Sequence, residues 1–147
     1  MNIKISFLLA LAIGLGACQS ETRSSDSGTA ASTEIGEAAI SRSVKSQEAK
    51  TLLEEQQGII VLDVRTQKEY EAGHVKDALQ IDFYSPDFAK HLQALDPAKP
   101  YMVYCAVGGR SGKAVKLMEE MGFKQLYNVS EGYGDLKKAG VPVESRK

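Results

Sequence analysis

The segment Cys105–Arg110, with the sequence CAVGGR, is the part of the chain whose residue types are best suited to chemistry. It follows the apolar run Tyr101–Tyr104, which predicts a short buried strand, and it precedes apolar residues at helical spacing from Ala114 to Met121. A strand that ends at Cys105 and passes directly into a helix places the sulfur at the strand's carboxyl end, with free N–H groups of the helix directed toward it. This electropositive setting favours a thiolate over a thiol. The spacing therefore predicts that Cys105 is a catalytic nucleophile.

The residues that follow the cysteine suit an anion-binding loop. Gly108 and Gly109 permit a tight curl with positive backbone dihedrals, so that consecutive N–H groups point inward as a nest. Arg110 closes the loop with a guanidinium that suits either binding an oxyanion or bracing the loop. We expect the substrate to be bound by Ala106, Val107, Gly108, Gly109 and Arg110. The alternative, in which Cys105 is an inert buried residue, is disfavoured by a glycine pair and an arginine directly before a helix.

The elements that must position this loop alternate along the chain. Strands are expected at Ile59–Leu62, Ala78–Ile81, Tyr101–Tyr104 and Gln125–Val129, with Val44 in a short edge strand. Helices are expected from Ser46, as N-cap, to Gln57, after a capping box of Thr66 and Glu69, from Ser85-Pro86 through Leu95, from the loop to Gly122, and around Asp135–Lys138. Strands that alternate with helices through short turns predict an α/β fold, with a parallel sheet of about five strands covered by helices on both faces.

The beginning of the chain has the pattern of an export signal. Lys4 is followed by the apolar run Ile5–Leu15, which is shorter than the roughly 20 residues of a spanning helix. The sequence Leu15-Gly16-Ala17-Cys18 resembles the lipobox of bacterial lipoproteins, which implies cleavage before Cys18 and lipidation of that residue. The alternative is an ordinary signal, with Cys18 left as a free thiol. We expect an exported protein that is lipid-anchored to a bacterial membrane, with its folded domain in the periplasm.

The expected domain organisation follows from a change in composition. Residues 1–17 form the lipoprotein signal peptide, and residues 18–43, rich in Ser, Thr, Glu, Ala and Gly, form a lipidated N-terminus and flexible tether. Residues 44–147 form the folded domain.

Charge and cysteine content exclude several classes of function. The formal net charge of -1, without a basic patch, gives no reason to expect a nucleic-acid partner. The 2 cysteines, Cys18 and Cys105, do not make a disulfide framework. His74 and His91 stand apart and no paired-cysteine motif is present, so we expect no metal site and no cofactor.

The folded part resembles a single-domain rhodanese of the rhodanese-like superfamily. The resemblance extends from about residue 43 to residue 144 and rests on several stretches in order: Leu62-Asp63-Val64-Arg65, Glu69-Tyr70, Gly73-His74-Val75, Ala78, Cys105–Ser111, Met121-Gly122-Phe123 and Lys138–Val143. It implies a doubly wound α/β domain in which Cys105 takes sulfur from a donor, becomes a persulfide and passes the sulfur to a nucleophile. Donors in this family include thiosulfate and low-molecular-weight persulfides, and acceptors include cyanide and thiols.

The resemblance also helps to compare alternative functions. Within the superfamily, a six-residue loop like Cys105–Arg110 accompanies sulfur chemistry, whereas a seven-residue loop accompanies phosphatases and arsenate reductases. Two alternatives to a sulfurtransferase therefore stay open: a sulfur-relay module that accepts sulfur without fast turnover and, less favoured, a phosphatase. Ala106 and Val107 are uncharged, which argues against thiosulfate as the natural donor. A Gly-Gly pair and a tryptophan that are common in the family are replaced by Glu131-Gly132 and Leu136, so we expect a repacked edge there.

A second group of polar residues could have either a catalytic or a structural role. Asp63, Arg65, Glu69 and His74 could act as an acid–base set, or they could form a buried salt-bridge and hydrogen-bond cluster that supports the sheet beneath the loop. We favour the structural reading, which agrees with the resemblance. Arg65 is retained as a candidate substrate-binding residue.

Overall fold

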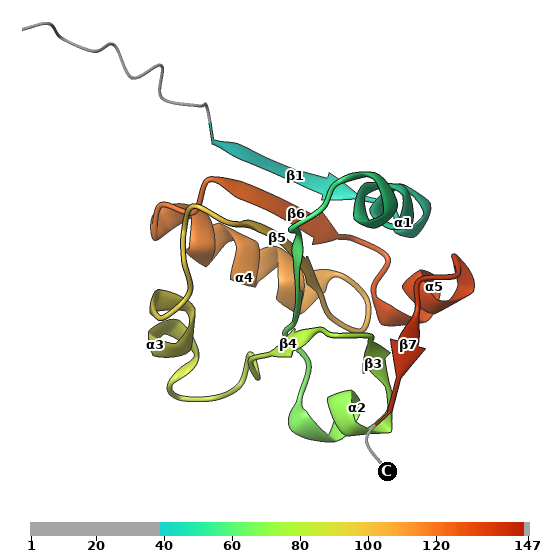
Figure 1. The fold of residues 1–147 in the computed structure, drawn as a ribbon. Helices are drawn as coiled ribbons and strands as arrows, with labels where there is room; N and C mark the ends of the chain where they lie inside the picture. Colours follow the sequence, from blue (N-terminus) through green and yellow to red (C-terminus); the bar gives the residue numbers. More distant parts are fainter. Residues whose placement is uncertain (1–38, 146–147) are drawn as a thin grey trace, which may run out of the picture. The chain divides into compact units, whose positions relative to one another are not determined.

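The structure is a computed structural model that describes residues 39–145. Its elements, in chain order, are β1 (Ile40–Val44), α1 (Ser46–Glu55), β2 (Ile60–Asp63), α2 (Gln67–Ala72), β3 (His74–Val75), β4 (Leu79–Gln80), α3 (Phe88–Gln93), β5 (Pro100–Tyr104), α4 (Gly109–Glu120), β6 (Gln125–Val129), α5 (Tyr133–Lys138) and β7 (Val143–Glu144) (Figure 1). Five strands form one parallel sheet in the order β1-β6-β5-β2-β4. The expected fold class is confirmed.

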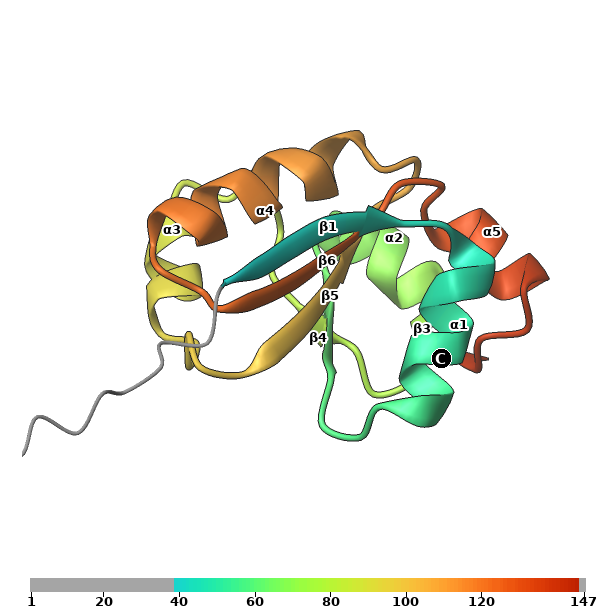
Figure 2. The ribbon, with the colours of Figure 1, turned by 90° about the horizontal axis from the view of Figure 1, so that it is seen from above.

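Helices cover both faces of this sheet. Along β5, Tyr101 and Val103 pack with residues of α3 and α4, whereas Met102 and Tyr104 pack with residues of α1, α2 and α5. Figure 2 shows α3 and α4 together on one side of the strands. Because every side chain of β5 from Tyr101 to Tyr104 is buried on one face or the other, the strand is continuously apolar rather than alternating.

The order of the strands reverses between β2 and β5. From β2 the chain moves outward to β4, and from β5 it moves outward in the opposite direction to β6. The carboxyl ends of the adjacent strands β2 and β5 therefore lie at the switch point where open α/β sheets bind ligands. Asp63 ends β2, and Cys105 directly follows β5.

The sheet begins earlier than expected. Residues 40–43, which the sequence assigned to the tether, form β1 with Val44 and pair in parallel with β6, from Ile40 opposite Gln125 to Val44 opposite Val129. The strand is exposed except at Val44, so its sequence lacks the apolar pattern of a buried strand. The boundary of the folded domain at residue 44 is thus corrected to include Ile40.

Two helix starts also differ from expectation. The N-cap of α1 is Lys45, and Ser46 is the first helical residue, whose N–H donates to Glu131 Oε2 over 2.9 Å. Helix α3 begins at Phe88 rather than at Pro86, because the residues before it form a turn in which the Asp87 N–H donates to Ser85 Oγ. The short antiparallel pair β3 and β7 was not anticipated.

The predicted signal peptide, Cys18 and most of the tether lie outside residues 39–145, so these assignments stay predictions. Within residues 39–145, no helix has the length and apolar character needed to cross a bilayer.

Candidate active site

The loop after β5 curls around the sulfur of Cys105. The Gly108 N–H donates to Sγ over 3.1 Å, and the Ser111 hydroxyl lies 3.6 Å from Sγ as a second donor. Gly108 has a φ of 84°, and a Cβ at this position would lie 2.1 Å from the Ser130 carbonyl oxygen. Only glycine fits this left-handed and crowded position. The expected inward curl is therefore present, and Gly108 is the residue on which it depends.

The surroundings of Cys105 favour its anionic form. Burial raises the pKa of the thiol, but hydrogen bonds from the backbone and side chain of Ser111 and from the backbone N–H groups of Val107 and Arg110 outweigh this effect and hold the pKa below its ordinary value. Cys105 is 1% exposed, so these bonds act where water screens little. The loop leads directly into α4, whose N-terminal dipole adds to the positive potential.

The loop before α5 supports the cradle from outside. The Tyr133 N–H donates to the Cys105 carbonyl over 2.8 Å. A Cβ on Gly132 would lie 2.2 Å from the Ala106 carbonyl oxygen, so glycine is required where the two loops meet. The preceding residue, Glu131, accepts the Ser46 N–H, and Leu136 is buried at 1% exposure. At the edge where a difference was expected, Leu136 thus fills part of the core and Glu131 joins this loop to α1.

Arg110 braces the loop through an ion pair with Glu69. Its Nη1 and Nη2 atoms donate to the two carboxylate oxygens of Glu69 over 2.8 and 2.7 Å. Glu69 also forms the capping box of α2 with Thr66, whose N–H and hydroxyl both donate to Glu69 Oε2. The bonds from Arg110, together with those from Thr66, lower the pKa of Glu69 to about 2. Of the two roles considered for Arg110, the structure shows the bracing one.

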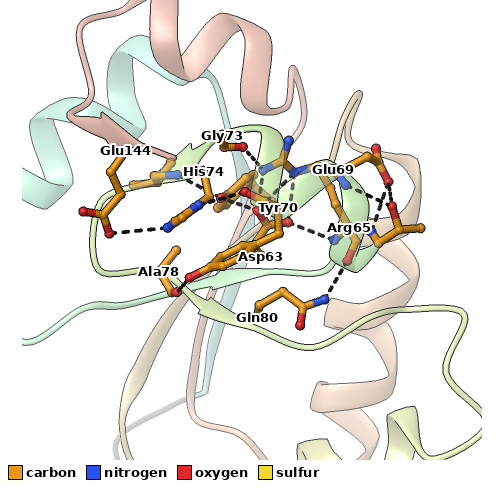
Figure 3. Close-up of polar contacts among 12 residues, drawn as sticks. Asp63, Arg65, Glu69, Tyr70, Gly73, His74, Ala78, Gln80 and Glu144 are labelled. Atoms are coloured by element: carbon orange, nitrogen blue, oxygen red, sulfur yellow. Dashed lines mark hydrogen bonds and ion pairs between the residues drawn. The ribbon is translucent and has the colours of Figure 1, made fainter. Parts of the chain in front are cut away.

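Asp63, Arg65 and His74 belong to the scaffold. Arg65 is 4% exposed, and its Nη2 donates to Asp63 Oδ2 over 2.6 Å and to the Gly73 carbonyl over 2.7 Å. Figure 3 shows Arg65 enclosed by these partners, with His74 beside Tyr70. The guanidinium also lies 4.1 Å from the centre of the Tyr133 ring. The Nε and Nη2 donors of Arg65 are thus taken by Asp63 and the Gly73 carbonyl, which fits the structural role. Its expected substrate-binding role stays a prediction.

Two residues of the site, Ser111 and Tyr84, were not singled out from the sequence, and a third, Glu69, was assigned to a different role. Ser111 is fully buried and directs its hydroxyl to Sγ, and its only sequence signal is a hydroxyl residue directly after the loop. Tyr84 is 68% exposed, and the Arg110 guanidinium carbon lies 5.6 Å from the centre of its ring. Glu69 was assigned to the cluster beneath the loop, but it contacts the loop itself. No local pattern marks Tyr84 or the partner of Glu69.

A cavity elsewhere in the domain has no connection to this chemistry. It has a volume of about 310 Å³ and is lined by residues of α1, β2, β3 and the segment from Gly140 to Pro142. None of these residues belongs to the loop around Cys105, so the candidate active site remains at the end of β5.

Comparisons with known proteins agree with this geometry. The profile of the rhodanese-like domain matches residues 45–139. Thiosulfate sulfurtransferase GlpE of Pseudomonas fluorescens is 32% identical over 89 residues, which cover 60% of this chain and 79% of that protein. The protein of the same name from Actinobacillus pleuropneumoniae is 27% identical over 91 residues, 62% of this chain and 82% of its own length.

Solved structures show the same architecture. The crystal structure of a rhodanese-like domain protein from Staphylococcus aureus has a TM-score of 0.62 at 27% identity, covering 72% of this chain and 99% of that one. A rhodanese-related protein from Thermoplasma volcanium has a TM-score of 0.60 at 28% identity, covering 70% and 97% respectively. With a profile match over most of the folded part and a shared fold, the chain belongs to the rhodanese-like family.

Proposed function

We propose that this chain is a sulfurtransferase that moves a sulfane sulfur from a donor to a thiophilic acceptor through a persulfide on Cys105. The observation that carries the proposal is the convergence of the Gly108 N–H and the Ser111 hydroxyl on a buried sulfur whose pKa is lowered. Relatives named thiosulfate sulfurtransferase support the same class of reaction.

The reaction needs only the groups of the loop. The Cys105 thiolate attacks the outer sulfur of the donor, a new S–S bond forms, and the donor's own bond to that sulfur breaks. The leaving group departs with the electron pair, as sulfite from thiosulfate or as a thiolate from a persulfide. An acceptor thiolate or cyanide then attacks the outer sulfur and regenerates the Cys105 thiolate. The loop N–H groups stabilise the negative charge that stays on sulfur through both steps.

The test is the formation of thiocyanate from cyanide with thiosulfate or an organic persulfide as the donor. The wild-type chain is expected to turn over, and Cys105→Ser is expected to be inactive while retaining its fold. Cys18→Ser is the matched control, since it removes the second cysteine of the chain, which lies outside the proposed site. The proposal fails if neither donor yields thiocyanate or an added sulfur on Cys105. Sulfur loading without turnover would instead indicate a relay module, and hydrolysis of phosphate esters that depends on Cys105 would indicate a phosphatase.

We also propose that the chain is exported and lipid-anchored through Cys18, with the folded domain in the periplasm. The support is the sequence Leu15-Gly16-Ala17-Cys18 after an apolar run. Expression in a bacterium with lipoprotein processing should give a membrane-bound product whose mass shows cleavage before Cys18 and added acyl chains. A soluble product of full-length mass, or no change in Cys18→Ala, would contradict this proposal.

A further inference from the structure

We infer that the site selects a singly charged sulfur donor with an apolar group over the thiosulfate dianion, and that Glu69 sets this preference by neutralising Arg110. This inference rests on the proposed function and specifies its substrate class. Arg110 carries the only charge among the side chains of the loop from Ala106 to Arg110. Both of its Nη atoms donate to Glu69 over 2.8 and 2.7 Å.

The charge balance disfavours a dianion. Once Cys105 is a thiolate, the thiolate, Arg110 and Glu69 together carry a net negative charge. Asp63 and Arg65 pair with each other and change this balance little. The next cation along the chain, Lys113, is exposed on α4, where water and salt screen its charge. The dipoles of the loop amides therefore act largely alone, and each additional negative charge on a donor is repelled.

The rim of the site instead offers apolar surface. Val107, in the loop itself, is 78% exposed. Tyr84 is 68% exposed and lies against the Arg110 guanidinium, which closes the loop. An exposed aliphatic and an exposed aromatic side chain at one site can bury an apolar group of the donor, a gain that thiosulfate cannot make.

Benzenethiosulfonate is a suitable probe because it replaces one oxyanion of thiosulfate with a phenyl group. The Cys105 thiolate attacks its outer sulfur, the S–S bond to Cys105 forms, and the bond between that sulfur and the sulfonyl sulfur breaks. Benzenesulfinate leaves with the electron pair, so the charge balances without an oxidant or reductant. The two donors deliver the same sulfur and differ in charge and in apolar area.

The experiment compares kcat/KM for the two donors at low ionic strength. Wild type is expected to prefer benzenethiosulfonate. Glu69→Gln keeps a capping-box residue at the third position of α2 but removes the charge that neutralises Arg110. One unit of charge a few ångströms from the donor should raise kcat/KM for thiosulfate, relative to that for benzenethiosulfonate, by about three- to ten-fold. Added salt should reduce this gain.

Matched variants separate this effect from a loss of structure. Glu71→Gln makes the same charge change on the same helix, where Glu71 contacts Gln67 and not Arg110, so the ratio of the donors should not change. Adding Arg110→Gln to Glu69→Gln should cancel the gain, because the freed cation is then absent. Val107→Lys, at an exposed position, should shift the ratio of the two kcat/KM values in the same direction as Glu69→Gln. It replaces Glu69→Gln as the test if that variant does not fold.

The outcomes distinguish this inference from the proposed function. If wild type prefers thiosulfate, or if neither Glu69→Gln nor Val107→Lys changes the ratio, the inference is overturned, while a persulfide on Cys105 from either donor keeps the proposed function intact. If neither donor places sulfur on Cys105, the proposed function fails and the inference fails with it.

Discussion

Replacing Ser111 with alanine should raise the pKa of Cys105 by about one unit. The Ser111 hydroxyl lies 3.6 Å from Sγ and also 3.0 Å from the Gly108 carbonyl oxygen, so its single proton is shared. A hydrogen bond to a charged group contributes about 1.5–3 kcal/mol. For a long and shared bond we take the lower end, about 1.5 kcal/mol, which corresponds to about one pKa unit.

The substitution should leave the loop in place. The Gly108 carbonyl still accepts the Gly112 N–H over 3.0 Å when the hydroxyl is removed. Below the thiol pKa, the thiolate fraction falls about ten-fold, but the nucleophilicity of each thiolate rises with its pKa with a slope of about 0.4–0.5. The rate of alkylation of Cys105 at a fixed pH should therefore fall by only about three- to four-fold.

The assay is the pH dependence of iodoacetamide alkylation, followed at the Cys105 peptide, together with the ultraviolet absorbance of the thiolate. Ser46→Ala is the matched control, because Ser46 is also a buried serine, at 3% exposure, and its hydroxyl has no hydrogen-bond partner among residues 39–145. It should leave the pKa of Cys105 unchanged. If the pKa of Cys105 in Ser111→Ala equals the wild-type value or lies below it, the account of how the loop stabilises the thiolate is wrong.

Three further predictions concern stability. Gly108→Ala should lower the melting temperature and prevent sulfur loading, because a Cβ would lie 2.1 Å from the Ser130 carbonyl oxygen in a backbone with positive φ, and a variant with wild-type stability would contradict this. The pKa of Glu69 is lowered from 4.5 to about 2, so the stabilisation by its ion pair is complete above pH 4.5 and is lost as the pH falls toward 2. The difference in melting temperature between wild type and Glu69→Gln should shrink over that range, and a constant difference would refute the assignment. Ser46→Ala should leave the free energy of unfolding in urea unchanged or raise it, because it removes a buried hydroxyl without a hydrogen-bond partner in the described residues. A decrease above about 1 kcal/mol would show that the hydroxyl has a partner.

The sequence predicted the features whose causes are local. The strand into Cys105, β6 and the capping box of Thr66 and Glu69 all follow from patterns within a few residues, and the structure confirms them. The loop could be predicted because two glycines and an arginine lie between a strand and a helix. The fold class followed from the alternation of these elements.

The features that were missed depend on residues far apart in the chain. Strands β1 and β7 are mostly exposed and form because β6 and β3 offer partners, so no apolar pattern marks them. Glu69 and Arg110 are 41 positions apart, and the pairing of one carboxylate with one guanidinium among many requires the fold itself. Arg65 was kept as a candidate substrate-binding residue, and its pairing with the buried Asp63 could be seen only in the folded chain.

The most direct test of the account is to locate the transferred sulfur. The full-length chain is incubated with a stoichiometric sulfane-sulfur donor, and its intact mass and peptides are compared with those of Cys105→Ser. We predict one added sulfur atom on the Cys105 peptide, removed again by cyanide with release of thiocyanate. An unmodified Cys105, or sulfur found only on Cys18, would contradict the claim that the loop amides stabilise a reactive sulfur anion.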